Sequence, residues 1–105
     1  MGKDGNIVSI DLDGTLLEQA YPEFGAVNKE AIDTIKEFQA NGYKIIIYTA
    51  RPWMDYSEIK QHLDNNNVPY DSIVCGKVIA KFYIDDRGVR FNGNWKEVVK
   101  QVLNK

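Results

Sequence analysis

The sequence predicts an α/β protein with a three-layer, Rossmann-like architecture, in which helices cover both faces of a parallel sheet of about four or five strands. Short runs rich in β-branched residues alternate with segments whose apolar residues recur at helical spacing. These runs are almost entirely apolar, which is typical of strands buried on both faces. At 105 residues the chain is expected to form a single domain, residues 1–105, around one core.

The elements follow one another in the order that such a fold requires. Strands are expected at residues 7–10, 43–48, 73–75 and 82–84. Helices are expected from the N-cap Asn28 to the stop at Gly42, around 56–63, and from the N-cap Asn94 to 103. A loop of roughly a dozen residues, marked by Pro22 and Gly25, separates the first strand from the first helix, and its length suggests a function.

Polar or charged residues follow each predicted strand. These groups are Asp11 with Asp13, Thr49 with Arg51, Gly76 with Lys77, and Asp85 with Asp86. In parallel sheets, ligands bind beyond the carboxyl ends of the strands. If all the strands are parallel, the four groups meet at one edge of the sheet and form a single site.

The carboxylates of this edge indicate a metal centre with phosphoryl chemistry. Close carboxylates repel one another unless a cation lies between them, and an oxygen-only ligand set favours Mg²⁺. The expected ligands are Asp11, Asp13, Asp85 and Asp86. Asp11 is then a candidate nucleophile toward phosphorus, and Asp13 a candidate general acid and base.

Hydrogen-bond donors are needed for the oxygens of a transferring phosphoryl group. Thr49 offers a hydroxyl and a backbone N–H, and either Lys77 or Lys81 offers an ammonium group. Arg51 is the first choice for a bidentate contact with the substrate. The expected phosphate- and substrate-binding residues are Leu12, Gly14, Thr15, Ala50 and Arg51.

In this order, the residues resemble the motifs of the haloacid dehalogenase (HAD) superfamily over nearly the whole chain. Asp11, Asp13, Gly14 and Thr15 match the first motif, DxDGT; Thr49 matches the second; Lys77, with Lys81 as the alternative, matches the third; Asp85 and Asp86 match the fourth. The resemblance implies an Asp11 nucleophile and an Asp13 acid/base. It also implies Mg²⁺ bound by the Asp11 carboxylate, the Asp13 carbonyl and an acid of the last motif.

The chain departs from most members of that superfamily in its size. One helix with a loop, or one helix with a strand, fills each interval where other members insert a cap domain, so this chain resembles a minimal, capless member. The site is then either open or covered by a neighbouring subunit in a homo-oligomer. Substrate choice is expected to depend on loops such as residues 18–26.

Composition narrows the partners and the location. The formal net charge of −2 gives no overall attraction to nucleic acid or to an anionic membrane. A single cysteine, Cys75, and the lack of a long apolar stretch favour a soluble, unprocessed protein of the cytoplasm. The expected partner is a small phosphate ester rather than a macromolecule. His62 is expected to be exposed on its helix.

The leading functional hypothesis is a Mg²⁺-dependent phosphomonoester hydrolase that forms an aspartyl phosphate on Asp11. A receiver-like signalling domain is the first alternative, but its phosphorylated Asp would follow a later strand. A non-catalytic protein that binds metal or phosphate is the second. A calcium loop is disfavoured, because Ser9 and Ala20 would occupy positions 1 and 12 of an EF-hand.

Overall fold

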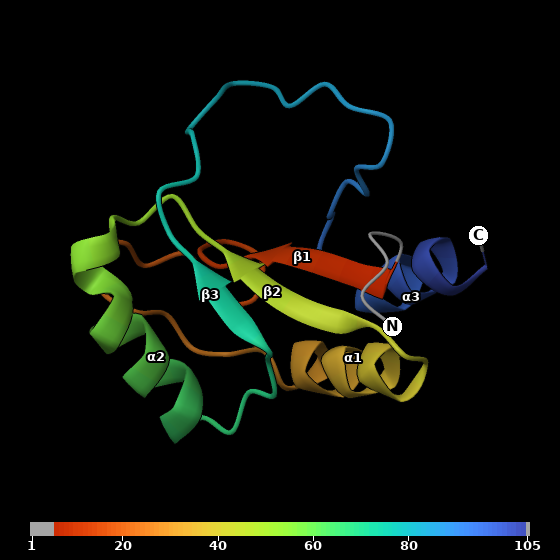
Figure 1. Ribbon diagram of the computed structural model, residues 1–105, viewed down its shortest axis with the longest axis horizontal. Coiled ribbons are helices and arrows are strands. Elements are labelled where there is room, and N and C mark those ends of the chain that lie inside the picture. The colour runs from red at the N-terminus through yellow and green to blue at the C-terminus, as the bar shows by residue number, and fades with distance from the viewer. Residues whose placement is uncertain (1–5, 105) are drawn as a thin grey trace.

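Three parallel strands form the centre of the protein, which a computed structural model describes over residues 6–104 (Figure 1). The elements, in order, are β1 (Ile7–Asp11), α1 (Lys29–Ala40), β2 (Lys44–Tyr48), η2 (Trp53–Asp55, a 3₁₀ turn), α2 (Tyr56–Asn65), β3 (Ser72–Val74) and α3 (Trp95–Leu103). The α/β class and the parallel sheet are therefore confirmed.

The strand order is β1-β2-β3, with β2 in the middle and parallel to both neighbours. Asp11 at the end of β1 pairs with Tyr48, and Tyr48 pairs with Val74 of β3. The three strands therefore end level with one another. Whatever residue follows each strand emerges at the same edge of the sheet.

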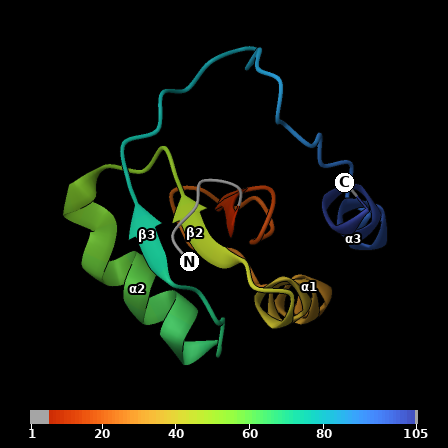
Figure 2. The same ribbon diagram turned by 45° about the vertical axis from the view of Figure 1, so that its right-hand side comes forward.

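The hydrophobic core lies on one face of the sheet. Successive side chains of a strand point to opposite faces, so Ile45 and Ile47 are buried, whereas Tyr48 is exposed. Helix α1 packs against β2, and it also lies beside α3 (Figure 2). The core residues that α1, α2 and α3 contribute are Ala31, Ile35, Phe38, Ile59, Leu63 and Trp95.

The other face of the sheet is covered less than the sequence predicted. Ile7, Tyr48 and Val74 point to that face, and their exposed fractions are 43%, 37% and 36%. A sheet covered by helices on both faces would bury all three. The protein thus departs from the expected three-layer arrangement at this face.

The fourth predicted strand, at residues 82–84, is not formed among the described residues. The chain from 76 to 94 contains no helix or strand and arches away from the sheet (Figure 1). Both of its ends are held in place: Gly76 and Lys77 bond to the backbone that follows β2, and Phe91 packs on Trp95 with ring centroids 4.6 Å apart. Between these anchors Phe82, Tyr83 and Ile84 remain exposed.

Helix starts lie where the sequence placed them. The Asn28 side chain accepts a hydrogen bond from the N–H of Glu30 at 2.8 Å, and the Asn94 side chain accepts one from Glu97 at 3.2 Å. Each bond satisfies an N–H that has no partner within the helix. Within residues 6–104, no helix is both long and apolar enough to span a membrane.

Candidate active site

The ends of the three strands surround a cavity of about 390 Å³. Residues from all three strand ends line it, together with side chains of two loops: Asp11, Asp13, Gln19, Tyr21, Thr49, Ala50, Arg51, Lys77, Ile79 and Tyr83. The convergence predicted from the sequence therefore exists for three of the four groups. The structure brings together the four residues predicted to be catalytic.

Asp11 lies at the end of β1 with a carboxylate that is 40% exposed to the cavity. Its Oδ1 is 4.0 Å from Nζ of Lys77. Burial raises the pKa of Asp11; the nearby Lys77 ammonium and the Leu12 backbone N–H oppose this rise, and the charge of Asp13 adds to it. Asp11 is thus a half-buried carboxylate beside one cation, and it only accepts hydrogen bonds when ionised.

The residues after Asp11 form a tight turn that closes on itself. Gly14 has φ +81°, a conformation that favours glycine, and its N–H donates to the carbonyl of Leu17 at 2.9 Å. The N–H of Thr15 donates to Leu12 at 3.3 Å. Gly14 and Thr15 were predicted to bind phosphate or substrate, but the structure uses both of their N–H groups inside the turn.

Thr49 is almost fully buried directly after β2. Its N–H donates to the carbonyl of Val74 at 2.9 Å, as part of the sheet. This N–H was predicted to be a donor to phosphate, and the structure shows that it is already used. Its Oγ1 accepts a hydrogen bond from the N–H of Arg51 at 3.1 Å. The hydroxyl keeps its own hydrogen as a donor.

Arg51 has a different role from the predicted one. Its guanidinium group is 3% exposed and forms a bidentate pair with Asp13, with Nε to Oδ2 and Nη2 to Oδ1 both at 2.8 Å. It also donates to the carbonyls of Pro22 and Glu23 at 3.0 and 2.8 Å. The hydrogen bonds that Arg51 donates to Asp13 raise the pKa of Arg51. The guanidinium is therefore engaged by the protein itself rather than presented to a substrate.

The loop between β1 and α1 packs around Arg51. The rings of Tyr21 and Phe24 lie 4.8 and 4.2 Å from the guanidinium carbon. Phe24 also stacks on His62 of α2, at 5.1 Å between ring centroids, and His62 Nε2 lies 3.0 Å from the carbonyl of Gly25. His62 is thus half-buried rather than exposed as predicted. No sequence pattern indicates these contacts, because their partners lie far apart in the chain.

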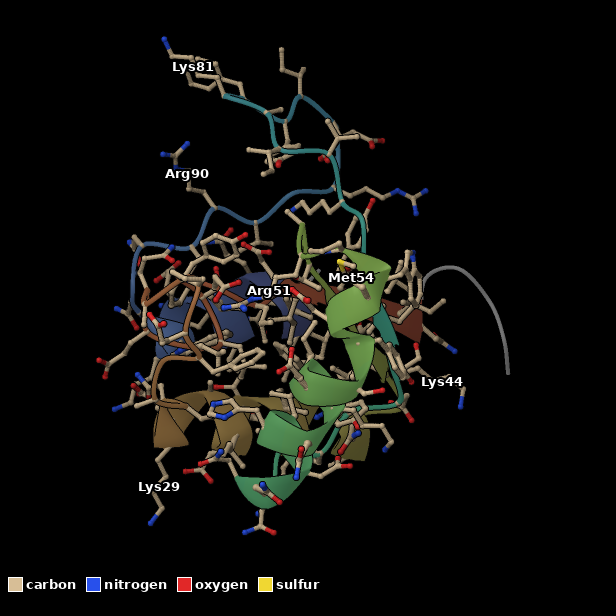
Figure 3. All side chains as sticks on the ribbon, turned by 90° about the vertical axis from the view of Figure 1, so that its left-hand side faces the viewer. Lys29, Lys44, Arg51, Met54, Lys81 and Arg90 are labelled. Carbon is tan, nitrogen blue, oxygen red and sulfur yellow. The ribbon has the colours of Figure 1, made fainter. Side chains whose placement is uncertain are left out.

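Lys77 and Lys81 have different surroundings. Lys77 follows Gly76, which has φ +84°, and its N–H donates to the carbonyl of Thr49 at 2.9 Å. This bond holds Lys77 at the strand ends, where its Nζ faces Asp11 and the ring of Tyr83 at 4.6 Å. Lys81 instead projects from the part of the arching segment that lies furthest from the sheet (Figure 3).

The acidic pair of the last predicted motif does not reach the other carboxylates. Asp85 Oδ1 accepts hydrogen bonds from the N–H groups of Arg87 and Gly88 at 2.9 and 2.7 Å, which closes a local turn. Asp86 is exposed. Among residues 6–104 no three His, Cys, Asp or Glu side chains are grouped closely enough to hold a metal ion. Of the four predicted metal ligands, the structure brings together Asp11 and Asp13.

Comparison with known proteins agrees with the motifs and the geometry. A family model described as a haloacid dehalogenase-like hydrolase matches residues 8–103. The chain belongs to the haloacid dehalogenase-like hydrolases. A crystal structure of a structural-genomics target from Vibrio cholerae is 30% identical, with a TM-score of 0.67 over 94% of this chain and 97% of that one. A search of curated protein sequences found no match.

A second solved structure has a similar fold at lower identity. It is a conserved protein from Bacteroides thetaiotaomicron, 21% identical, with a TM-score of 0.69 over 93% of this chain and 89% of that one. The protein is therefore a small HAD-type hydrolase with a Rossmann-like fold, and the cavity at its strand ends is the candidate active site.

The raised pKa of Asp11 leads to a test of stability. A carboxyl whose pKa is higher in the folded than in the unfolded state destabilises the fold when ionised, and this penalty disappears as the pH falls below the unfolded value. We expect Asp11→Asn to raise the melting temperature at pH 7, in the presence of a chelator. The gain should shrink below about pH 4, where unfolded Asp is also protonated.

Thermal unfolding followed by circular dichroism at both pH values measures this effect. The matched control is Asp33→Asn, which changes an exposed carboxylate on α1. A melting temperature for Asp11→Asn below that of the unaltered protein at pH 7 would contradict the conclusion that ionised Asp11 destabilises the fold.

Proposed function

We propose that this HAD-type hydrolase is a Mg²⁺-dependent phosphatase that cleaves phosphomonoesters through an aspartyl phosphate on Asp11. The observation that carries the proposal is the juxtaposition of Asp11 and Lys77, 4.0 Å apart at the mouth of one cavity, with Asp13 in the same turn. A nucleophile, a cation for the phosphoryl oxygens and an acid/base are the groups that such a reaction needs. The volume of the cavity suits a small substrate.

The chemistry divides into two displacements at phosphorus. A carboxylate oxygen of Asp11 forms a bond to phosphorus while the ester P–O bond breaks, and Asp13 donates a proton to the departing alcohol oxygen. In the second step Asp13 takes a proton from water, and the water oxygen attacks phosphorus. The acyl-phosphate P–O bond breaks, which releases inorganic phosphate and restores the Asp11 carboxylate.

Thr49 and Lys77 are placed to stabilise the negative charge on the phosphoryl oxygens. The Thr49 hydroxyl and the Lys77 ammonium both line the cavity next to Asp11, so both can donate to the equatorial oxygens. The chain carries a second acid beside the nucleophile, Asp13, which provides for hydrolysis of the phosphoenzyme. This favours turnover over the long-lived phosphorylation of a receiver domain.

The residues at the strand ends fit a magnesium ion in their chemistry. Mg²⁺ is bound in proteins through one or two carboxylates together with substrate phosphate, and the available donors here are oxygens. The Asp11 carboxylate and the Asp13 carbonyl would hold it, with a carboxylate from Asp85 or Asp86. The bound metal would neutralise charge on the nucleophile and on the phosphoryl group. Because the acidic pair lies on the arching segment, its participation requires that segment to approach the free edge of β1.

The nucleophile is tested by removing its charge at constant shape. Asp11→Asn should lower Mg²⁺-dependent turnover of an aryl phosphate by a factor of about 10⁴ or more, because no carboxylate remains to attack phosphorus. Asp33→Asn is the control on an exposed surface. A chelator should abolish the activity of the unaltered protein, and added Mg²⁺ should restore it. Turnover retained by Asp11→Asn would refute the mechanism.

The two acids of the last motif can be told apart by metal dependence. We expect either Asp85→Asn or Asp86→Asn to raise the Mg²⁺ concentration needed for half-maximal activity by about 10- to 100-fold, because one ligand is lost. The other variant should change it far less. Titration of activity with Mg²⁺ measures this value. Unchanged titrations in both variants would show that neither carboxylate binds the metal.

The phosphate-contacting lysine is tested with paired variants. Lys77→Met should weaken inhibition by vanadate, which mimics the transferring phosphoryl group, by about 10²-fold, since a charged donor is lost beside Asp11. Lys81→Met should have little effect, because that side chain lies at the far end of the segment. If Lys81→Met weakens inhibition and Lys77→Met does not, the assignment is reversed.

A further inference from the structure

The buried guanidinium of Arg51 connects two parts of the site: the Asp13 carboxylate and the loop that leads to α1. On one side it holds both carboxylate oxygens of Asp13 at 2.8 Å. On the other it holds the carbonyls of Pro22 and Glu23, in the loop of residues 18–27 between β1 and α1. Figure 3 shows Arg51 in the interior of the protein.

Most of the N–H donors of the Arg51 guanidinium are engaged by other residues of the protein. Four of its five N–H groups are engaged in these four hydrogen bonds. An ionised carboxylate has about four lone-pair sites, so Asp13 retains sites that can accept a proton or a hydrogen bond from a hydroxyl group after binding Arg51. A lysine cannot reproduce this planar set of donors, because its ammonium is a single point of charge.

The 18–27 loop also supplies side chains to the cavity. Gln19 and Tyr21 line it, and the ring of Tyr21 lies against the guanidinium while remaining 61% exposed. These two side chains therefore face the cavity in which a substrate would bind. Their placement depends on the backbone next to Pro22, which Arg51 holds.

The outer side of the same loop is fixed to α2. Phe24 lies between the guanidinium and the ring of His62, and His62 Nε2 contacts the Gly25 carbonyl at 3.0 Å. The N–H of Glu18 donates to the carbonyl of Ala26 at 2.9 Å, which joins the two ends of the loop. Arg51 thus lies at the centre of a layered stack from the loop to the helix.

We propose that Arg51 is a positioning residue that couples the acid/base Asp13 to the 18–27 loop, so that proton delivery and recognition of the leaving group depend on one guanidinium. Phe24 and His62 form the outer anchor of this coupling. The role of Arg51 in proton delivery rests on the proposed phosphatase function. Its role in holding the 18–27 loop does not depend on that function.

Two substrates with different leaving groups distinguish a loss of proton delivery by Asp13 from a general loss of activity. p-Nitrophenolate leaves without protonation, whereas the alkoxide of β-glycerophosphate needs a proton from an acid. We expect Arg51→Lys to lower kcat/KM for β-glycerophosphate by about 10²-fold or more, and for p-nitrophenyl phosphate by less than about 10-fold. Equal losses on both substrates would overturn the coupling to Asp13.

A double-mutant cycle shows whether Arg51 acts through Asp13. In the Asp13→Asn background the acid is already absent, so Arg51→Lys should cause no further change in the ratio of the two kcat/KM values. A ratio that falls by the same factor in both backgrounds would mean that Arg51 acts independently of Asp13, and the proposal would fail. Arg90→Lys, at an exposed position, is the matched control for an arginine-to-lysine change.

Hydrogen exchange tests the structural part without any turnover. The amides of Glu18 and Tyr21 donate to the Ala26 carbonyl and to Gln19 Oε1 at 2.9 and 3.3 Å. They should exchange at least about 10-fold faster in Arg51→Lys than in the unaltered protein, while amides of β2 keep their protection. Unchanged exchange in the loop would overturn the proposal. If the loop loosens but the unaltered protein hydrolyses neither ester, the phosphatase function fails and the structural role of Arg51 stands.

A second variant keeps the test decisive if Arg51→Lys does not fold. Phe24→Leu removes the ring between Arg51 and His62 but leaves the ion pair with Asp13 intact. It should speed exchange in the loop and lower the ratio of β-glycerophosphate to p-nitrophenyl phosphate activity by about 3- to 10-fold, a smaller effect because the carboxylate remains paired. No change in either measurement would contradict the proposed anchor.

Discussion

The parallel pairing of three strands in matched register is the constraint on which the rest of the structure depends. Because Asp11, Tyr48 and Val74 are paired across the sheet, the chain leaves all three strands at the same height. A shift of one residue in either pairing would turn the side chains of one strand to the opposite face and bury its polar end. The site is therefore a consequence of sheet register before it is a consequence of any side-chain contact.

The second constraint is a buried charge that must be paired. A guanidinium group that is 3% exposed is tolerated only where carboxylate and carbonyl oxygens surround it, and Asp13 with the 18–27 loop supplies them. Arg51 cannot leave this position without leaving Asp13 and two carbonyls unpaired. The same interaction therefore stabilises the loop and limits the movement of the candidate acid/base.

The candidate site combines one carboxylate whose pKa is raised with one carboxylate that is held by a buried guanidinium. Burial raises the pKa of Asp11, whose nearest cation is 4.0 Å away, whereas Asp13 accepts two short hydrogen bonds from Arg51. Two carboxylates two residues apart in sequence thus have very different surroundings. Different roles for paired acids are commonly produced in this way, by the environment rather than by the residue type. This difference agrees with the nucleophile and acid/base roles proposed for them.

The sequence by itself determined the α/β class, the three strands whose ends converge, and the placement of Asp11, Asp13, Thr49 and Lys77 at those ends. These predictions succeed because local patterns, such as apolar runs and DxDGT, and the parallel-sheet rule are sufficient to derive them. Only the tertiary structure decided that Arg51 faces inward, since its partners are 28 to 38 residues away. It also decided that residues 82–84 stay off the sheet, because strand formation requires a paired edge and not only β-branched or aromatic residues.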